Sequence, residues 1–203
     1  MCLSHILTRA DEWNGRKGNS YTEGMEVKMG TLKIVPVTER WDLVGKPVSE
    51  FLKSLPDISM VGVTEIDASL SDTAAFCAHY QVGMELAANC VVLEAKRGER
   101  VWLSACVILG STRADVNGLA RKTLDARKVS FAPMEKAVAE SGMEYGAITP
   151  VGLPKDWNIL IDSVVASTPY VIIGSGIRNS KLAVPGSFLA SLPGAQVLDG
   201  LAK

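Results

Sequence analysis

The sequence has few of the residues that metal centres and nucleophilic enzymes need. Among its 203 residues there are two histidines and four cysteines, and no pair of cysteines stands in a C-x-x-C spacing. A zinc site needs clustered Cys and His ligands, and an activated nucleophile needs a neighbouring base. We therefore expect no metal site and no cofactor, and no nucleophile–base pair is legible.

Long apolar runs and an excess of either charge are also missing. No stretch of 18 apolar residues occurs, and the N-terminus has no signal-peptide core. We therefore expect no membrane association and a cytoplasmic location with reduced thiols. The net charge of -1 gives no bulk attraction to nucleic acid. Any polyanionic partner must be met by a local basic patch.

The composition and length fit one globular domain. Hydrophobic residues make up 47% of the chain and charged residues 21%, which are ordinary values. Residues 1–28 are polar and show no sustained periodicity, so we expect a loosely ordered N-terminal extension. Residues 29–203 are expected to form the domain.

Strand-like and helical patterns alternate along this domain. We predict an α+β fold, with a single mixed β-sheet or a part-closed barrel flanked by helices. The sequence predicts strands over 60–66, 89–95, 100–110, 158–165 and 170–174, and helices from Ser71, over 114–124 and from Pro133 to Gly142.

The loop "GMEYGAITPVGLP" (142–154) is the first candidate site. Pro150 lacks an N–H and favours an extended conformation at Thr149. Gly146 and Gly152 allow backbone conformations that a side chain would forbid. Such a loop could present N–H groups and the Thr149 hydroxyl to a ligand. A plain connection from helix to strand is the alternative.

A second loop, "IIGSGIRNSKL" (172–182), could bind an anion. The backbone of Gly174-Ser175-Gly176 can curl so that successive N–H groups point at one ligand, with Arg178 and Lys181 supplying charge. A glycine-rich hairpin turn is the alternative.

Asp162 interrupts the apolar run "NILIDSVV" and is the third candidate. A buried carboxylate without partners is costly. We therefore expect Asp162 to be hydrogen-bonded to neighbouring loops or to a ligand, or else to lie exposed at a sheet edge.

Taken in order, these segments resemble the YbaK/EbsC family of aminoacyl-tRNA deacylases, which includes the ProX-type proteins and the insertion domain of bacterial prolyl-tRNA synthetases. "GAITPVG" (146–152) resembles the family's G-G-[IV]-[ST]-P-[IL]-G loop, and "ILID" (159–162) resembles the strand that follows it. "IGSGIRNSKLAV" (173–184) resembles the [SG]-G-x-R-x-x-x-[LI] segment, and "ARKVSFAPMEKAV" (126–138) a lysine-containing strand and helix.

The resemblance implies metal-independent hydrolysis of the ester in misacylated tRNA, with tRNA(Pro) as a typical substrate. It also implies translation fidelity as the role and a transient association with an aminoacyl-tRNA synthetase. It leaves the oligomeric state open. The resemblance assigns catalytic positions to Thr149, Asp162 and Asn89, and substrate-binding positions to Gly146, Ala147, Ile148, Pro150, Gly152, Gly174, Ser175, Gly176, Arg178 and Lys128.

Asn89 departs from the family pattern, which has a lysine at this position. Asparagine keeps hydrogen bonding but has no positive charge. Lys128 or Arg178 could compensate. Without compensation, a non-catalytic module could bind aminoacyl-tRNA, a nucleotide or a small ligand in the same cleft. A fragment of a prolyl-tRNA synthetase is a third alternative.

Overall fold

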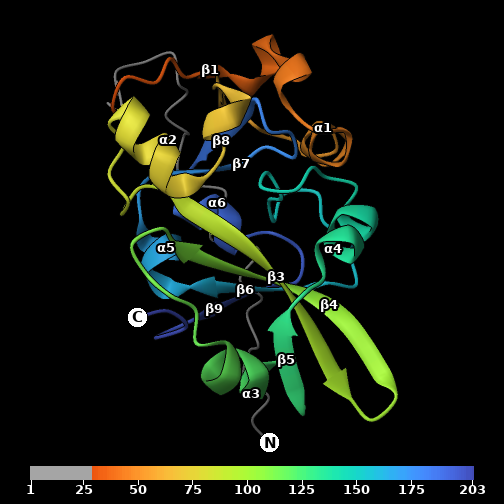
Figure 1. Cartoon of the computed structure of the whole chain (residues 1–203). Helices are drawn as coiled ribbons and strands as arrows, with labels where there is room; N and C mark the ends of the chain where they lie inside the picture. Colours follow the sequence, from red (N-terminus) through yellow and green to blue (C-terminus); the bar gives the residue numbers. More distant parts are fainter. Residues whose placement is uncertain (1–28) are drawn as a thin grey trace, which may run out of the picture.

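The computed structural model describes residues 29–203, and the extension expected for residues 1–28 lies outside the described residues. A five-stranded sheet forms the larger half of the domain (Figure 1). Its strands, in spatial order, are β5 (Lys128–Phe131), β3 (Ala88–Arg97), β4 (Arg100–Leu109), β6 (Asn158–Asp162) and β9 (Ala195–Leu198). The pairs β4–β6 and β6–β9 are parallel and the others are antiparallel, so the sheet is mixed.

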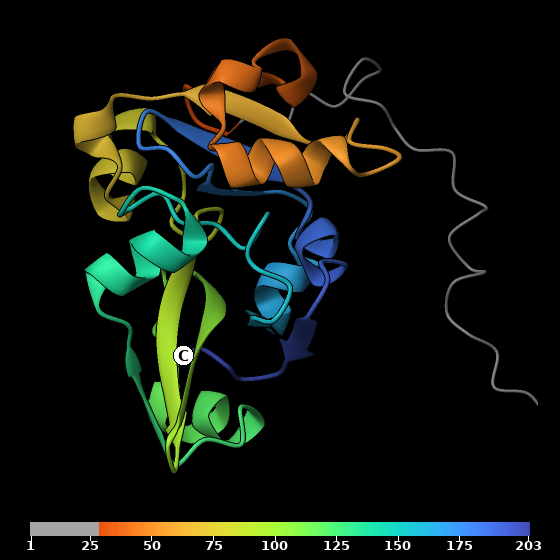
Figure 2. The same cartoon turned by 90° about the vertical axis from the view of Figure 1, so that its right-hand side faces the viewer.

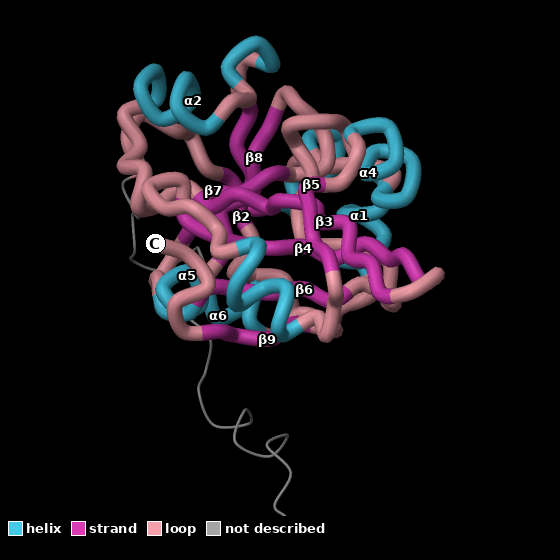
Figure 3. The backbone as a smooth tube through the Cα atoms, turned by 60° about the horizontal axis from the view of Figure 1, so that its bottom comes forward, coloured by secondary structure: helices cyan, strands magenta, loops and turns pink. Residues whose placement is uncertain are grey.

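A second sheet of four strands packs beside the first, as Figure 3 shows. Its strands, in spatial order, are β1 (Val35–Pro36), β2 (Gly62–Glu65), β8 (Ser180–Val184) and β7 (Val171–Gly174). A parallel bridge between Ala87 and Ile172 joins the two sheets, and the Ile172 N–H donates to the Leu86 carbonyl at 2.7 Å. The residues just before β3 and the start of β7 therefore meet at this junction.

Helices cover both sheets (Figures 1 and 2). The α-helices are α1 (Lys46–Lys53), α2 (Thr73–Tyr80), α3 (Arg121–Thr123), α4 (Met134–Ser141), α5 (Ser163–Ser167) and α6 (Gly186–Ala190). Short 3₁₀ turns occur at η2 (Val37–Glu39), η3 (Trp41–Leu43) and η4 (Ala68–Leu70), and η5 (Val116–Ala120) is a π-turn that leads into α3. Within residues 29–203, no helix has the length and hydropathy needed to cross a bilayer.

The main core fills the space between the sheets. Val107 and Ile161 from the larger sheet share this core with Leu182 and Val184 from β8, and all four are buried. Alternating apolar residues on facing strands produce such a core because successive side chains point to opposite faces.

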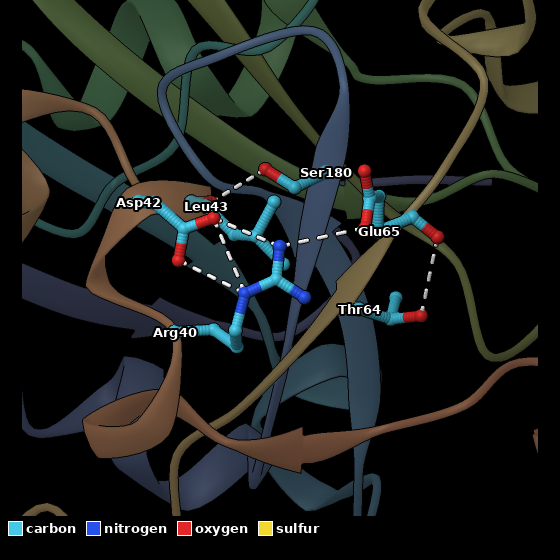
Figure 4. Close-up of polar contacts among 6 residues, drawn as sticks. All are labelled: Arg40, Asp42, Leu43, Thr64, Glu65 and Ser180. Atoms are coloured by element: carbon cyan, nitrogen blue, oxygen red, sulfur yellow. Dashed lines mark hydrogen bonds and ion pairs between the residues drawn. The ribbon is translucent and has the colours of Figure 1, made fainter.

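Polar contacts fix β8 against the segment before α1 (Figure 4). The Ser180 hydroxyl donates to the Leu43 carbonyl at 2.5 Å, and the Ser180 and Ser175 hydroxyls lie 2.7 Å apart. Arg40 forms ion pairs with Asp42 and Glu65 next to these contacts. Their effect is to hold the start of β8, the strand that carries Lys181.

The predicted α+β class and the single domain flanked by helices are confirmed, with three corrections. The strands form two sheets instead of one, and neither closes into a barrel within residues 29–203. The strand predicted over 158–165 ends at Asp162, where α5 begins. Asp72, not Ser71, is the N-cap of α2, and its carboxylate accepts from the N–H groups of Ala74 and Ala75.

Candidate functional site

A pocket of about 730 Å³ opens at the junction of the two sheets. Residues 88–92 of β3 form one wall, and the start of α2 and part of α4 flank it. Gly174 at the end of β7 and Lys181 in β8 form the opposite side. Its volume is in the range of small-ligand sites, which is about 300–1,000 Å³. Its polar lining residues are Ser71, Asp72, Thr73, Asn89, Arg178 and Lys181.

Lys181 is a buried cation in the wall of this pocket. Its side chain is 7% exposed, and its Nζ donates to the Ser71 carbonyl at 3.0 Å. Nζ also lies 5.6 Å from the centre of the Phe76 ring. Burial lowers the pKa of Lys181 below its ordinary value of 10.5, because desolvation penalises the charged form. Within residues 29–203, no carboxylate forms a salt bridge with it.

Asn89 and Cys90 lie side by side on β3 at the pocket wall. The Asn89 Oδ1 accepts from the Thr73 hydroxyl at 2.5 Å, which leaves the Nδ2 group to donate to a ligand. Burial raises the pKa of the Cys90 thiol far above its ordinary value of 9.0. Cys90 is therefore a neutral thiol at physiological pH and a poor nucleophile.

The two predicted loops dock against each other. The Gly176 N–H donates to the Ala147 carbonyl at 2.9 Å, and the Glu144 N–H donates to the Gly176 carbonyl at 3.0 Å. The Arg178 N–H donates to the Glu144 carboxylate at 2.7 Å. A Cβ added to Gly174 would lie 2.4 Å from the Ala147 carbonyl oxygen, so this close approach needs glycine. Both loops thus form one rigid edge of the pocket.

Three large apolar side chains line the pocket and remain exposed. They are Phe131 at 68%, Met134 at 52% and Tyr145 at 58% exposure. Folding normally buries such groups, and a cluster of them beside a pocket indicates a contact surface. Arg178, also exposed, lines the same pocket, and its guanidinium donates to the Ala68 carbonyl at 3.2 Å.

The structure brings only some of the predicted site residues into the pocket. Asn89, Gly146, Ile148, Gly174 and Arg178 line it. The predicted positions outside its lining are Thr149, Asp162, Ala147, Pro150, Gly152, Ser175, Gly176 and Lys128. Gly152 has a φ of +84°, and an added Cβ would lie 2.5 Å from the Pro47 carbonyl oxygen, so this glycine allows the loop to pack on the start of α1.

Thr149 and Asp162 are both buried, and neither lines the pocket. Thr149 is fully buried, and its hydroxyl has no hydrogen-bond partner within the described part of the chain. Asp162 is 4% exposed, and its two carboxylate oxygens accept from the N–H groups of Val164 and Ala202. These bonds cap α5 and hold the C-terminal segment, as one of the alternatives for Asp162 anticipates.

Lys128 lies at the end of β5 away from Phe131, opposite Lys96, and it does not line the pocket. Lys181 is the buried cation that lines it. Lys181 lies at the end of the second loop. The sequence indicates it as a site residue because it is a charged residue within the apolar strand "SKLAV". Phe131, Met134 and Tyr145 had no such signal, because an isolated apolar residue is equally compatible with a core position.

Comparisons with known proteins agree with this geometry. The model of the aminoacyl-tRNA editing domain matches residues 67–191. A structure described as a "putative trans-editing enzyme for prolyl tRNA synthetase" superimposes with a TM-score of 0.64 at 20% identity, covering 76% of this chain and 94% of that chain. The hypothetical protein APE2540 gives a TM-score of 0.66 at 21% identity, covering 78% of this chain and all of that chain. At these identities the structures establish the fold alone, and the comparison with curated proteins gave no match.

The family match extends over more than half of the chain, and every residue that lines the pocket falls within 67–191. The resemblance to YbaK-like proteins is thereby confirmed. This chain belongs to the family of aminoacyl-tRNA editing domains.

Proposed function

We propose that this protein is a trans-editing deacylase, which hydrolyses the ester between a wrongly attached amino acid and its tRNA. The observation that carries the proposal is a pocket within the editing domain that is lined by both a buried ammonium group, Lys181, and the amide of Asn89. A cation and a hydrogen-bond donor in one pocket suit an ester whose carbonyl oxygen becomes negative during hydrolysis.

In this reaction, water attacks the carbonyl carbon of the ester. The bond from that carbon to the ribose oxygen then breaks, and the ribose oxygen takes up a proton. Lys181 donates one of its three N–H groups to the Ser71 carbonyl, so the other two can donate to the developing oxyanion. The neutral Cys90 thiol does not act as nucleophile, and a neighbouring ribose hydroxyl of the substrate assists the attacking water. The protein contributes positioning and electrostatic stabilisation.

In this proposal the exposed side chains that line the pocket bind the terminal adenosine. Tyr145 and Phe131 offer aromatic faces for the base, since stacking on an aromatic ring contributes about 1–3 kcal/mol per base. Arg178 meets the adjacent phosphate. Thr149 and Asp162 were predicted as catalytic positions. Because neither lines the pocket, the role that we propose for them is to hold the first loop and the end of β6 in place.

The substrate class that we propose is a small amino acid misattached to tRNA(Pro). Pocket size is how editing sites exclude the larger correct amino acid, so a small side chain is the one that such a site admits. We place this reaction in the cytoplasm, where tRNA is aminoacylated. Transient contact with the synthetase would bring the protein close to newly misacylated tRNA.

A panel of misacylated tRNAs, incubated with the purified protein, tests the proposal. We expect faster ester loss with at least one of them than in buffer, and the rate should fall in the variant Lys181→Met. Lys46→Met changes an exposed lysine of α1 that does not line the pocket, and it serves as the control. Spontaneous rates with every tRNA in the panel would overturn the proposal.

The second candidate is a non-catalytic module that binds an aminoacyl-tRNA, a nucleotide or a small ligand in the same pocket. Asn89, which stands where the family has lysine, favours it. Under this alternative the wild-type protein binds a non-hydrolysable aminoacyl-adenosine amide and shows no hydrolysis.

A further inference from the structure

One end of the domain carries a strong positive charge although the whole chain is nearly neutral. Residues 96–100 and 121–128 contain seven basic and two acidic residues, a local charge of +5, while the chain has a formal net charge of -1. All nine charged side chains are exposed. We call this group the basic end, and its members are Lys96, Arg97, Glu99, Arg100, Arg121, Lys122, Asp125, Arg127 and Lys128.

The two sequence segments of the basic end lie together in space. Lys96 of β3 pairs with Lys128 of β5, and the Arg127 N–H donates to the Lys96 carbonyl at 2.9 Å. Arg97 forms an ion pair with Asp125, in the turn that connects α3 to β5. Figures 1 and 2 show the tip of the β3–β4 hairpin, β5 and α3 together at the end of the molecule opposite α1 and α2.

Two cross-strand pairs within the basic end join like charges. Lys96 lies directly opposite Lys128, and Arg97 lies directly opposite Arg100 across the hairpin turn. Like charges that face each other across a strand pair are destabilising. Asp125 neutralises Arg97 alone, since no salt bridge within residues 29–203 involves Lys96, Arg100, Arg127 or Lys128. The fold thus retains a repulsion that a bound polyanion would relieve.

Protection of a sheet edge explains only part of this charge. β5 is an edge strand, and lysine on an edge discourages pairing with another sheet. That reason applies to Lys128, and also to Arg100, because β4 pairs with β6 only from Ser104 onward. It does not apply to Arg121 and Lys122, which lie on α3.

The basic end also has a direct spatial relation to the pocket. Strand β3 forms the pocket wall with residues 88–92 and continues to Arg97 at the basic end. Five residues of extended strand span about 17 Å. A nucleic acid whose 3′ end enters the pocket would therefore bring its phosphates over β3 and β5 to these cations.

We infer that the basic end is a docking surface for the phosphate backbone of the tRNA acceptor stem. This inference rests on the proposed function, because it concerns the same substrate, and it adds the surface that holds the double-stranded part. Lysine and arginine that neutralise phosphates make binding dependent on salt, with a slope that grows with the number of contacts.

The inference is tested by fluorescence anisotropy with a labelled RNA hairpin that copies an acceptor stem and its CCA end and carries no amino acid. The variant carries Lys96→Gln, Arg127→Gln and Lys128→Gln, three side chains that form no ion pair with any residue of the described range 29–203. Each lost phosphate contact should reduce the slope of log K against log salt by about 1. We expect the slope to fall by about 3 and the affinity at 0.1 M salt to fall roughly 100-fold.

The control variant carries Lys46→Gln, Lys53→Gln and Lys155→Gln, three exposed lysines outside the basic end and the pocket. It has the same net charge as the test variant, so equal salt slopes in the two would overturn the inference. Both variants are compared with wild type in thermal unfolding. The test variant should unfold at the same or a higher temperature, because it removes the repulsion between Lys96 and Lys128, so weaker RNA binding cannot come from a loss of the fold. Binding to vesicles of phosphatidylserine and phosphatidylcholine, without binding to the hairpin, would also overturn it.

Two hydrolysis measurements separate this inference from the proposed function. On a misacylated tRNA the test variant should lose activity, while on aminoacyl-adenosine, which has no stem, it should equal wild type. Equal activity of wild type and variant on the tRNA would overturn the docking surface and leave the editing function intact. Salt-dependent RNA binding through the basic end with no hydrolysis of either substrate would overturn the editing function and leave the docking surface intact.

Discussion

The Nζ of Lys181 donates to the carbonyl oxygen of Ser71 at 3.0 Å, across the wall of the pocket. Ser71 directly precedes the N-cap of α2, so this bond joins β8 to the start of that helix. It also fixes the ammonium group in a site where its charge is poorly solvated. A poorly solvated, preorganised charge stabilises a developing oxyanion more than a hydrated one does.

Replacing Lys181 with methionine should abolish most of the hydrolysis and leave the fold intact. Removal of one oxyanion donor typically lowers kcat by about 100- to 1,000-fold. Stability should change little, because the apolar side chain removes a buried charge while the Ser71 carbonyl loses a partner. Single-turnover deacylation and urea denaturation measure the two effects. A variant that unfolds as wild type does and retains full activity would contradict the role of Lys181.

The buried lysine should also give stability a particular dependence on pH. Because its pKa is lowered in the folded state, the unfolded chain binds more protons at pH values between the lowered pKa and 10.5. The free energy of unfolding should therefore rise with pH through this window. Comparison of wild type with Lys181→Met at pH 7 and pH 10 isolates this contribution, since the other titrating groups are common to both. We expect the free energy of unfolding of the wild type, relative to that of the variant, to be larger at pH 10 than at pH 7. A smaller relative value at pH 10 would contradict the lowered pKa.

Introducing lysine at position 89 decides between catalysis and binding alone. In Asn89→Lys a second ammonium group enters the pocket that contains Lys181, and the hydrogen bond to Thr73 is lost. If Lys181 already supplies the charge, hydrolysis should fall about tenfold through repulsion between like charges. Asn89→Gln, which adds no charge, is the control. Hydrolysis that appears only in Asn89→Lys would instead identify the native protein as a binding module.

The sequence predicted the elements whose pattern is unambiguous and failed where an apolar run has two interpretations. Strands were predicted over 89–95 and 100–110, and in the structure they pair as the β3–β4 hairpin. Val164 and Val165 extend the apolar run of β6, but Asp162 caps a helix that begins at Ser163. Periodicity cannot separate a short buried strand from a short buried helix.

The candidate site was predictable only in part for a different reason. Both loops carry glycine signals, the first also has proline, and they do contact each other in the structure. The pocket, however, unites Asn89 from one sheet with Lys181 from the other. Their proximity depends on how the two sheets pack, which involves long-range contacts that no local pattern reports. Sequence reasoning accordingly looked to Lys128 and Arg178 for the missing charge.

A substitution at Thr149, which is buried and does not line the pocket, tests whether its hydroxyl affects stability or activity. Its hydroxyl has no partner within residues 29–203, and an unsatisfied buried hydroxyl lowers stability. Thr149→Val keeps the shape and should raise the free energy of unfolding by about 1 kcal/mol. Activity should stay at the wild-type level if Thr149 only positions the loop. Increased stability with lost activity would show that the hydroxyl contacts the substrate.

Asp162 should prove to be a stability determinant. Its Oδ1 accepts from the Val164 N–H at 3.0 Å, and its Oδ2 accepts from the Ala202 N–H at 2.9 Å. Asp162→Ala removes a helix N-cap and leaves the Ala202 N–H without its partner, which together should cost about 2 kcal/mol. Asp156→Ala, at an exposed acid before β6, is the control and should leave stability unchanged. Because Asp162 lies outside the pocket, kcat/KM per folded molecule should equal that of wild type. A stable but inactive Asp162→Ala would return the carboxylate to the catalytic role that the family resemblance assigns to it.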